Sequence, residues 1–124
     1  MDFVTYEIGK KLQEKGYPHG YNRFGYRPIY SDECTIKYLS DIGAYEEDYY
    51  GEHIPCPTID EVLKWLRNEK KLHLELVIVV DGEYMCDIYK INVRPIKCLG
   101  STEYSKTYEQ AAIAGIEYVL DNLI

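Results

Sequence analysis

The most constraining feature of the sequence is a pair of strand-like runs joined by Asp81-Gly82. Leu72 to Val80 is mostly apolar and rich in β-branched residues, and so short a run is typical of a strand. Asp-Gly is a strong hairpin signal, because a type I′ turn needs positive φ at both central positions. Glu83 to Ile91 is therefore predicted to be the return strand of an antiparallel hairpin.

Two amphipathic helices are predicted to flank this hairpin. Thr58 and Glu61 form a capping box at the start of the first, and Thr107 and Gln110 form a second box at the start of the last. Each helix then carries one apolar stripe at helical spacing. The two stripes comprise Ile59, Val62, Leu63 and Leu66 in the first helix and Ala112, Ile113, Ile116, Val119, Leu120 and Leu123 in the last.

A shorter third strand is predicted over residues 94–99 and is expected to end at residues 100–102. Pro95 cannot donate to a ladder, so it should lie at an edge or at the start of this strand. The predicted class is α+β, with an antiparallel sheet of about three to five strands and helices packed on one face. The order α-β-β-β-α over residues 58–124 resembles the double-stranded-RNA-binding fold. The predicted core comprises Ile59, Leu63, Leu66, Leu76, Ile78, Ile88, Ile113, Ile116 and Leu120.

Residues 1–57 are predicted to form one helix followed by an irregular, tyrosine-rich segment. Thr5 caps the helix, which runs to about Lys15, and Gly16 ends it in the left-handed conformation with Tyr17 packed back on Leu12. Short strands are expected near residues 24–30 and 34–39. Residues 40–57 are expected to be loop, and loops of this length are often functional. A chain of 124 residues predicts one domain, with parts 1–57 and 58–124.

The charge pattern disfavours nucleic acid as a partner. The formal net charge is −7, with 10 acidic and 6 basic side chains in residues 1–57 and 11 and 8 in residues 58–124. A surface of this sign repels phosphate backbones. The double-stranded-RNA-binding fold binds phosphates with Lys and Arg side chains at the start of its last helix. The matching stretch of this chain, residues 105–110, has one Lys beside a Glu. RNA binding is therefore kept only as an alternative.

A cytoplasmic protein without a membrane segment is expected. No apolar run approaches the ~20 residues that span a bilayer, and residues 1–5 lack a basic region followed by an apolar one. The four cysteines, Cys34, Cys56, Cys86 and Cys98, form no C-x-x-C pair and are expected to be reduced thiols. Cys86 and Cys98 fall in predicted strands and are expected to be small core residues.

Motifs for metal binding or catalysis are weak. His53 and Cys56 have H-x-x-C spacing, with His19 and Cys34 nearby, but a structural zinc site needs four ligands in closed geometry. No nucleophile elbow, phosphate-binding loop or dinucleotide motif is present, and residues 46–48 are expected to be solvated carboxylates. The chain is therefore expected not to be an enzyme and to use no metal or cofactor. No small-molecule ligand is identified.

Protein interaction is the leading hypothesis. The segment from residue 38 to residue 50 mixes tyrosines with carboxylates, and tyrosine is enriched at interfaces. The residues expected to bind a partner, either another protein or a second copy of the chain, are Tyr38, Tyr45, Tyr49, Tyr50 and Trp65. One alternative is that these tyrosines only cover a small core. A second alternative is an acidic protein that imitates nucleic acid and inhibits a host protein, although ordinary solubility explains the charge equally well.

Stretches at both ends and in the middle of the chain resemble a family of small uncharacterised proteins encoded in gut Bacteroidetes genomes and their phages or mobile elements. These stretches are Phe3-Val4-Thr5-Tyr6-Glu7 with Glu14-Lys15-Gly16-Tyr17, Pro57-Thr58-Ile59 with Leu63-Lys64-Trp65-Leu66-Arg67, and Thr107-Tyr108-Glu109-Gln110-Ala111 with Ala114-Gly115-Ile116 and Leu120-Asp121-Asn122-Leu123-Ile124. The resemblance implies a cellular setting and brings no known activity and no site.

Overall fold

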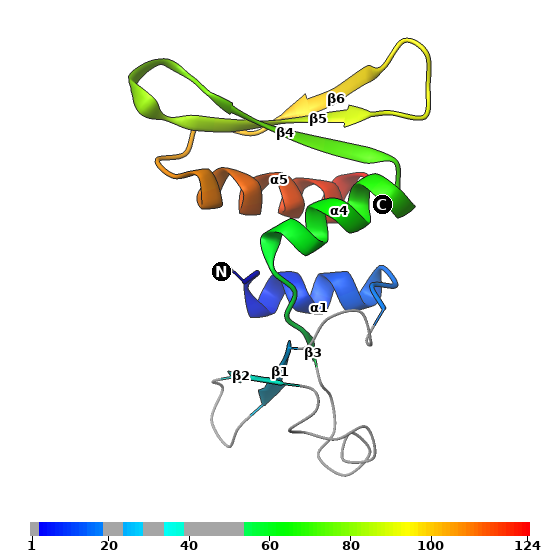
Figure 1. Ribbon diagram of the computed structural model, residues 1–124, viewed down its shortest axis with the longest axis vertical. Coiled ribbons are helices and arrows are strands. Elements are labelled where there is room, and N and C mark those ends of the chain that lie inside the picture. The colour runs from blue at the N-terminus through cyan, green and yellow to red at the C-terminus, as the bar shows by residue number, and fades with distance from the viewer. Residues whose placement is uncertain (1–2, 19–23, 29–33, 39–53) are drawn as a thin grey trace. The chain divides into compact units, whose positions relative to one another are not determined.

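The computed structural model describes residues 3–18, 24–28, 34–38 and 54–124 (Figure 1). The chain divides into two compact units, one over residues 3–58 and one over residues 59–124. The division lies one residue from the one expected between residues 57 and 58. That the two parts make one domain stays a prediction.

Among its described residues, the first unit contains one helix and a small antiparallel sheet. The helix is α1 (Tyr6–Glu14), and the strands are β1 (Phe24–Pro28), β2 (Cys34–Tyr38) and β3 (Ile54–Pro55), in the order β2-β1-β3. Both strands expected before residue 40 are present. The loop expected over residues 40–57 is wrong at Ile54 and Pro55, which pair with Tyr26 and Gly25 of β1. Proline is tolerated there because β3 lies at an edge of this sheet. The rest of that expected loop, up to residue 53, lies outside the described residues.

Helix α1 begins and ends as its sequence predicts. The Thr5 hydroxyl accepts a hydrogen bond from the Ile8 N–H at 3.3 Å, which caps the first turn. Gly16 follows the helix with a φ of 89°, and the Tyr17 N–H donates to the Leu12 carbonyl at 2.9 Å. This is the Schellman ending, in which a left-handed residue lets the chain satisfy a terminal carbonyl of the helix.

The second unit has the predicted α-β-β-β-α order and α+β class. Its elements are α4 (Ile59–Glu69), β4 (Leu72–Ile78), β5 (Tyr84–Lys90), β6 (Lys97–Ser101) and α5 (Tyr108–Asn122). The strands form one antiparallel sheet in the order β4-β5-β6. Both helices of the unit lie on the same face of this sheet, and no helix of residues 59–124 covers the opposite face (Figure 1).

The hairpin between β4 and β5 confirms the expected backbone conformation at its tip. Asp81 and Gly82 have φ values of 70° and 73°, so both lie in the left-handed region. The loop is one residue longer than a two-residue turn: Val80 to Gly82 lie between Val79 and Glu83, and the Val79 N–H donates to the Glu83 carbonyl at 2.8 Å. Residues at the tip that tolerate positive φ allow this close return.

The third strand lies farther along the chain than predicted. β6 begins at Lys97, after the cis peptide bond between Arg94 and Pro95, and it contains Gly100, which was expected to end it. A Cβ at Gly100 would lie 3.0 Å from the hydroxyl of Tyr118 on α5. This glycine therefore lets the tyrosine pack against the strand, which is a tertiary role and not a turn signal.

Most of the predicted core is buried, and two expectations are wrong. Ile59, Leu66, Ile88, Ile116 and Leu120 are buried, whereas Leu63, Leu76 and Ile113 are half-buried. Ile78 is 70% exposed because it is the last residue of β4, at the hairpin end of the sheet. Cys86 is buried as expected, but Cys98 is exposed because it lies on edge strand β6, opposite Tyr89 on the uncovered face of the sheet.

Candidate functional site

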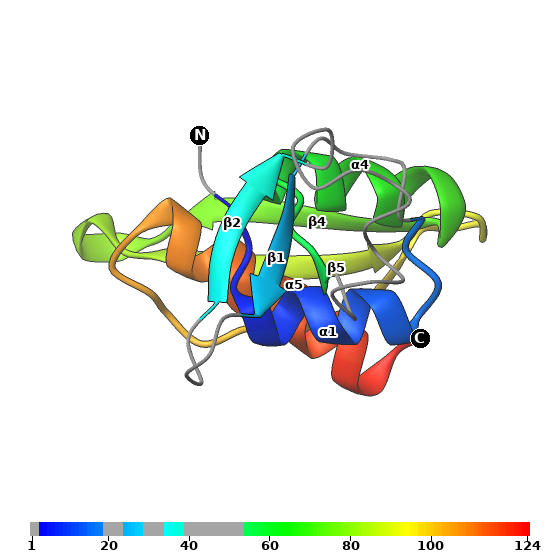
Figure 2. The same ribbon diagram turned by 90° about the horizontal axis from the view of Figure 1, so that it is seen from below.

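A groove of about 540 Å³ runs along the junction of α4 and β4 in the second unit. In Figure 2, α4 lies beside β4 on the side away from β5. The groove is lined by Asp60, Leu63, Lys64, Arg67 and Asn68 from α4, by His73, Leu74, Glu75 and Leu76 from β4, and by Tyr108 from the first turn of α5. One wall is therefore a helix face and the other is the outer strand of the sheet.

The outer edge of β4 presents backbone groups to this groove. Among the described strands, β4 pairs with β5 alone. The Lys71 carbonyl accepts from the Ile91 N–H at 3.0 Å, and the Val79 N–H donates to the Glu83 carbonyl at 2.8 Å, so the odd-numbered residues bond toward β5. Antiparallel strands alternate in this respect, so the even-numbered residues direct their N–H and C=O groups outward. These residues are Leu72, Leu74, Leu76 and Ile78, and two of them, Leu74 and Leu76, line the groove.

The helix wall follows one face of α4. Asp60, Leu63, Lys64 and Arg67 recur at the spacing i, i+3, i+4 and i+7, which places them in one row. The side chains of Lys64 and Arg67 are exposed, and neither has an ion-pair partner within the described ranges. Asp60 lies in the first turn of the helix. The groove is therefore cationic toward the end of α4 and acidic toward its start.

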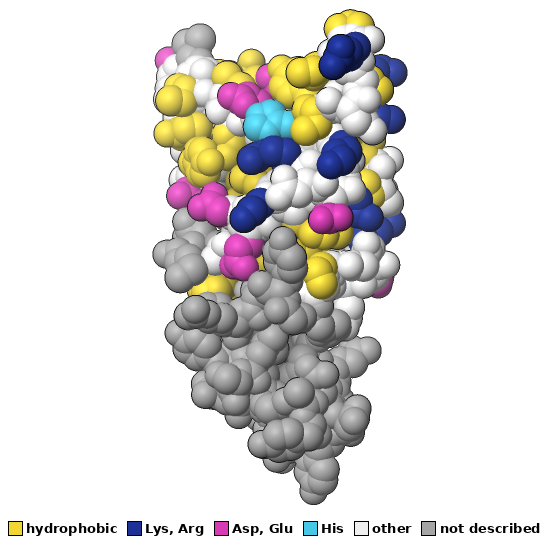
Figure 3. All heavy atoms as spheres, turned by 45° about the vertical axis from the view of Figure 1, so that its right-hand side comes forward, with side chains coloured by type: hydrophobic (Ala, Val, Ile, Leu, Met, Phe, Trp, Pro, Cys, Tyr) yellow, Lys and Arg dark blue, Asp and Glu magenta, His cyan; other side chains and the backbone are white. Residues whose placement is uncertain are grey.

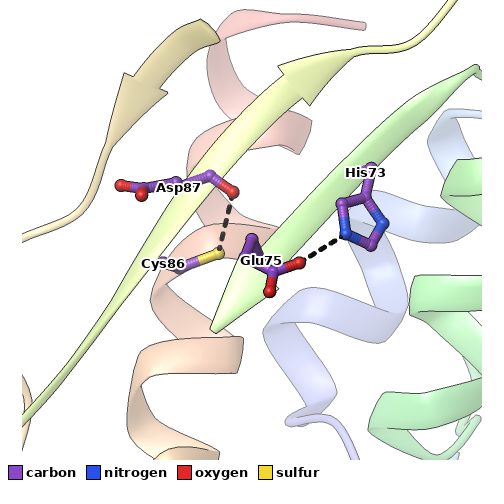
Figure 4. A network of polar contacts seen from close by, with 4 residues as sticks. All are labelled: His73, Glu75, Cys86 and Asp87. Carbon is purple, nitrogen blue, oxygen red and sulfur yellow. Dashed lines mark hydrogen bonds and ion pairs between the residues drawn. The ribbon is translucent and has the colours of Figure 1, made fainter. Parts of the chain in front are cut away.

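A polar pair on β4 lies at the mouth of the groove. The His73 Nε2 lies 2.7 Å from an Oε2 of Glu75, and the two side chains are 33% and 55% exposed (Figure 4). They point to the same face of the strand because they are two residues apart. Each side chain satisfies the other, so the carboxylate of Glu75 is already occupied.

The nearby thiol is not placed for catalysis. Burial, followed by the negative charges of Asp87 and Glu75, raises the pKa of Cys86 to about 12. The thiol donates to the backbone carbonyl of Asp87 at 3.9 Å (Figure 4). Cys86 pairs with Leu76 on the helix-covered face, whereas His73 lies on the opposite face. The sheet therefore separates the imidazole from a thiol that stays protonated, and thiolate is the nucleophilic form.

The uncovered face of the sheet also carries a satisfied polar pair. The Ser101 hydroxyl donates to an Oδ1 of Asp87 at 2.6 Å. The same carboxylate is the main cause of a raised pKa at Tyr89, because its negative charge disfavours the phenolate. The hydrogen bond between Ser101 and Asp87 therefore joins β6 to β5 on this face.

The acidic end of the groove is aromatic. The rings of Tyr84 and Tyr108 meet edge to face, with centroids 6.2 Å apart. Tyr84 pairs with Ile78, and Tyr108 is 43% exposed. Partial burial, followed by the charge of Asp60, raises the pKa of the Tyr108 hydroxyl. The apolar surface at this end thus continues from the groove to the tip of β4.

Charges in the second unit are sorted along the sheet. Lys71 precedes β4 at the end where Lys90 and Lys97 pair across β5 and β6, and the hairpin end carries Asp81 and Glu83. Figure 3 shows Lys and Arg side chains gathered mostly on one side of the view and Asp and Glu side chains mostly on the other. The net charge therefore understates a local cationic region beside the groove.

Of the five residues expected to bind a partner, the structure describes the side chain of Trp65 alone. Tyr45, Tyr49 and Tyr50 lie outside the described residues, and Tyr38 is described only as the last backbone position of β2, so their role stays a prediction. Trp65 is not part of the predicted apolar stripe of its helix, but its side chain is 3% exposed and therefore buried. The buried arc of α4 is Ile59, Val62, Trp65 and Leu66, which is wider than the predicted stripe and leaves Leu63 to the groove.

The described part of the chain contains no group of three or more His, Cys, Asp and Glu side chains that could hold a metal ion. Cys56 is described and is fully buried, whereas His19 and His53 lie outside the described residues. None of the helices in the described residues has the length and apolar character needed to cross a membrane.

The groove was not predicted from the sequence, although two patterns in the sequence match parts of its lining. His73 and Glu75 alternate with leucines along β4, as expected for a strand covered on one face. Lys64 and Arg67 are three residues apart, so they share a helix face. No pattern in the sequence indicates that α4 lies beside the open edge of β4.

Together the fold and the groove define a class: an α-β-β-β-α module with an open strand edge beside a helix. No family model, curated protein or solved structure matches the chain.

Proposed function

We propose that this protein is a non-enzymatic interaction module that binds an extended segment of a partner protein between α4 and β4. The observation that carries the proposal is the outward direction of the Leu74 and Leu76 backbone groups within the groove. An extended peptide satisfies such groups by adding a strand to the sheet. The setting that we propose is the cytoplasm of a bacterium or a mobile-element system, as the resemblance of its sequence implies.

The position of α4 favours a peptide over a second copy of the chain. A strand that adds to β4 lies about 4.8 Å from it. Packed helices need about 8–10 Å between their axes. Helix α4 lies on the outer side of β4 (Figure 2). Pairing the β4 strands of two copies would therefore bring both α4 helices to the junction between those strands. A bare extended segment meets no such obstacle.

The opposite edge of the sheet is less suited to strand addition. β6 has five residues against seven in β4, and its pairing with β5 is interrupted by a register shift at Ile88 and Tyr89. Short, irregular edge strands that carry lysine are typical of edges that resist pairing. The proposed site is therefore β4 and not β6.

The test begins with a library of displayed ten-residue peptides, from which binders to the full chain are selected. A selected peptide is then added to the labelled protein, and amide hydrogen exchange is followed by NMR. Strand addition should newly protect the Leu74 and Leu76 amides, whereas the Glu75 and Val77 amides are already bonded to β5. Protection confined to other elements would overturn the proposal.

N-methylated peptides supply a second readout that leaves the protein unchanged. In an added strand, alternate peptide N–H groups face β4 and the others face away. Methylating one alternate set should abolish binding, and methylating the other should leave it intact. Equal tolerance of both sets would contradict strand addition, because side-chain docking has no such alternation.

A further inference from the structure

The geometry points to a specific class of partner: an extended segment that carries two carboxylate side chains two residues apart, which Lys64 and Arg67 recognise. This inference rests on the proposed function and adds the chemistry that the groove selects. The two carboxylates are internal Asp or Glu side chains of the partner segment.

The two cations are free to bind, in contrast to the two lysines that follow the helix. Lys71 donates through its Nζ to the Asn68 carbonyl at 2.8 Å, and the Nζ of Lys70 lies 5.3 Å from the centroid of the Trp65 ring. Lys64 and Arg67 line the groove and have no such engagement among the described residues.

The carboxylates inside the groove do not neutralise these cations. Glu75 is occupied by His73 at 2.7 Å. Asp60 lies one helical turn before Lys64, and no ion pair joins them among the described residues. A basic segment would therefore face two unpaired cations, and an acidic segment would supply their missing partners.

The spacing of the cations suits alternate residues of a strand. Lys64 and Arg67 are three residues apart, which is about 4.5 Å along a helix axis. Side chains on one face of a strand repeat every two residues, or about 6.6 Å. The difference of about 2 Å is within the reach of flexible Lys and Arg side chains, and Arg can bind a carboxylate in a bidentate manner.

The positions that alternate with the two carboxylates are filled with valine. These positions point to the opposite face of the added strand, away from Lys64 and Arg67. Val is a strong strand former, so it maintains the extended backbone that strand addition needs. The probe that follows is a capped heptapeptide of sequence Thr-Val-Glu-Val-Glu-Val-Thr.

The experiment compares this peptide with the same peptide carrying Gln in place of both Glu residues, by fluorescence anisotropy on the full chain. Two partly exposed charge pairs should make the Glu peptide on the order of tenfold tighter. This preference should shrink as salt rises, because screening weakens exposed pairs. A Gln peptide that binds equally well would overturn the inference.

Charge reversal supplies the matched variants. The double change Lys64→Glu and Arg67→Glu should remove the preference for the Glu peptide and transfer it to a peptide with Lys at both positions. The control, Lys90→Glu with Lys97→Glu, makes the same change of charge outside the groove and should keep the preference. Loss of the preference in the control as well would overturn the inference, because it would show a response to overall charge.

Failure of this inference is distinguishable from failure of the proposed function. If selected peptides protect the Leu74 and Leu76 amides but show no preference for Glu, only the acidic specificity is wrong. If no peptide protects those amides, strand addition itself is wrong.

Discussion

Gly115 of α5 lies directly against Cys86 of β5. A Cβ at Gly115 would overlap the Sγ of Cys86, and it would also lie 3.1 Å from Cδ2 of Leu74 on β4. Gly115 and Cys86 are both buried. Helix α5 therefore contacts β5, the central strand of the sheet, at its glycine. The absence of a Cβ there allows the close approach.

Gly115→Ala is expected to destabilise the protein although alanine is the better helix former. Overpacking costs about 1–3 kcal/mol, and the gain in helix propensity returns about 1 kcal/mol. We expect a net loss of about 1 kcal/mol in the free energy of unfolding, measured by urea denaturation followed by circular dichroism. Adding Cys86→Ala should make the cost of the Gly115 change smaller, because the thiol that it strikes is gone. A Gly115→Ala protein more stable than the parent would contradict the packing described.

Thiol labelling should separate the cysteines of the second unit. Cys98 is exposed, whereas Cys86 is fully buried and its pKa is raised to about 12. Because the thiolate is the reactive form, iodoacetamide at pH 8 should modify Cys98 and spare Cys86 in the folded protein. Both should react in urea, and mass spectrometry of the peptides reports each site. Comparable rates at the two sites in the folded protein would be incompatible with this environment.

The raised pKa of Cys86 also predicts a pH dependence of stability. The folded thiol holds its proton up to about pH 12, whereas the unfolded thiol loses its proton near its ordinary value of 9.0. The folded state thus binds more protons in this window, so the contribution is complete below pH 9 and is lost as pH rises. The decline of the free energy of unfolding between pH 8 and 10 should be shallower in Cys86→Ala than in the parent. Cys98→Ala is the control and should decline as the parent does.

The start of α5 depends on one side-chain hydrogen bond. The Thr107 hydroxyl accepts from the Gln110 N–H at 3.1 Å. Thr107→Ala should lower the free energy of unfolding by about 1 kcal/mol, because it leaves a terminal N–H of the helix without this acceptor. Thr107→Ser keeps the hydroxyl and should change stability much less. Equal losses in the two variants would show that the methyl group, and not the cap, is responsible.

The candidate site shows where prediction from sequence reaches its limit. Lys64 and Arg67 could be placed on one helix face, and the alternation through His73 and Glu75 indicates which side of β4 is covered. Trp65 could not be placed correctly, because helical spacing assigns an angle around the helix and does not say how wide an arc becomes buried. The tyrosines at 45, 49 and 50 lie outside the described residues, so the interaction expected of them stays a prediction.

By itself the sequence determined the order of the helices and strands in the second unit, and it placed the start of the last helix and the tip of the hairpin. The caps at Thr107 and Thr5 and the left-handed positions at Asp81 and Gly82 are set by interactions within a few residues, which is why they could be predicted. Only the tertiary structure decided which strand edge stays open and which helix lies beside it. These features depend on the packing of segments far apart along the chain, and local spacing carries no information about that packing.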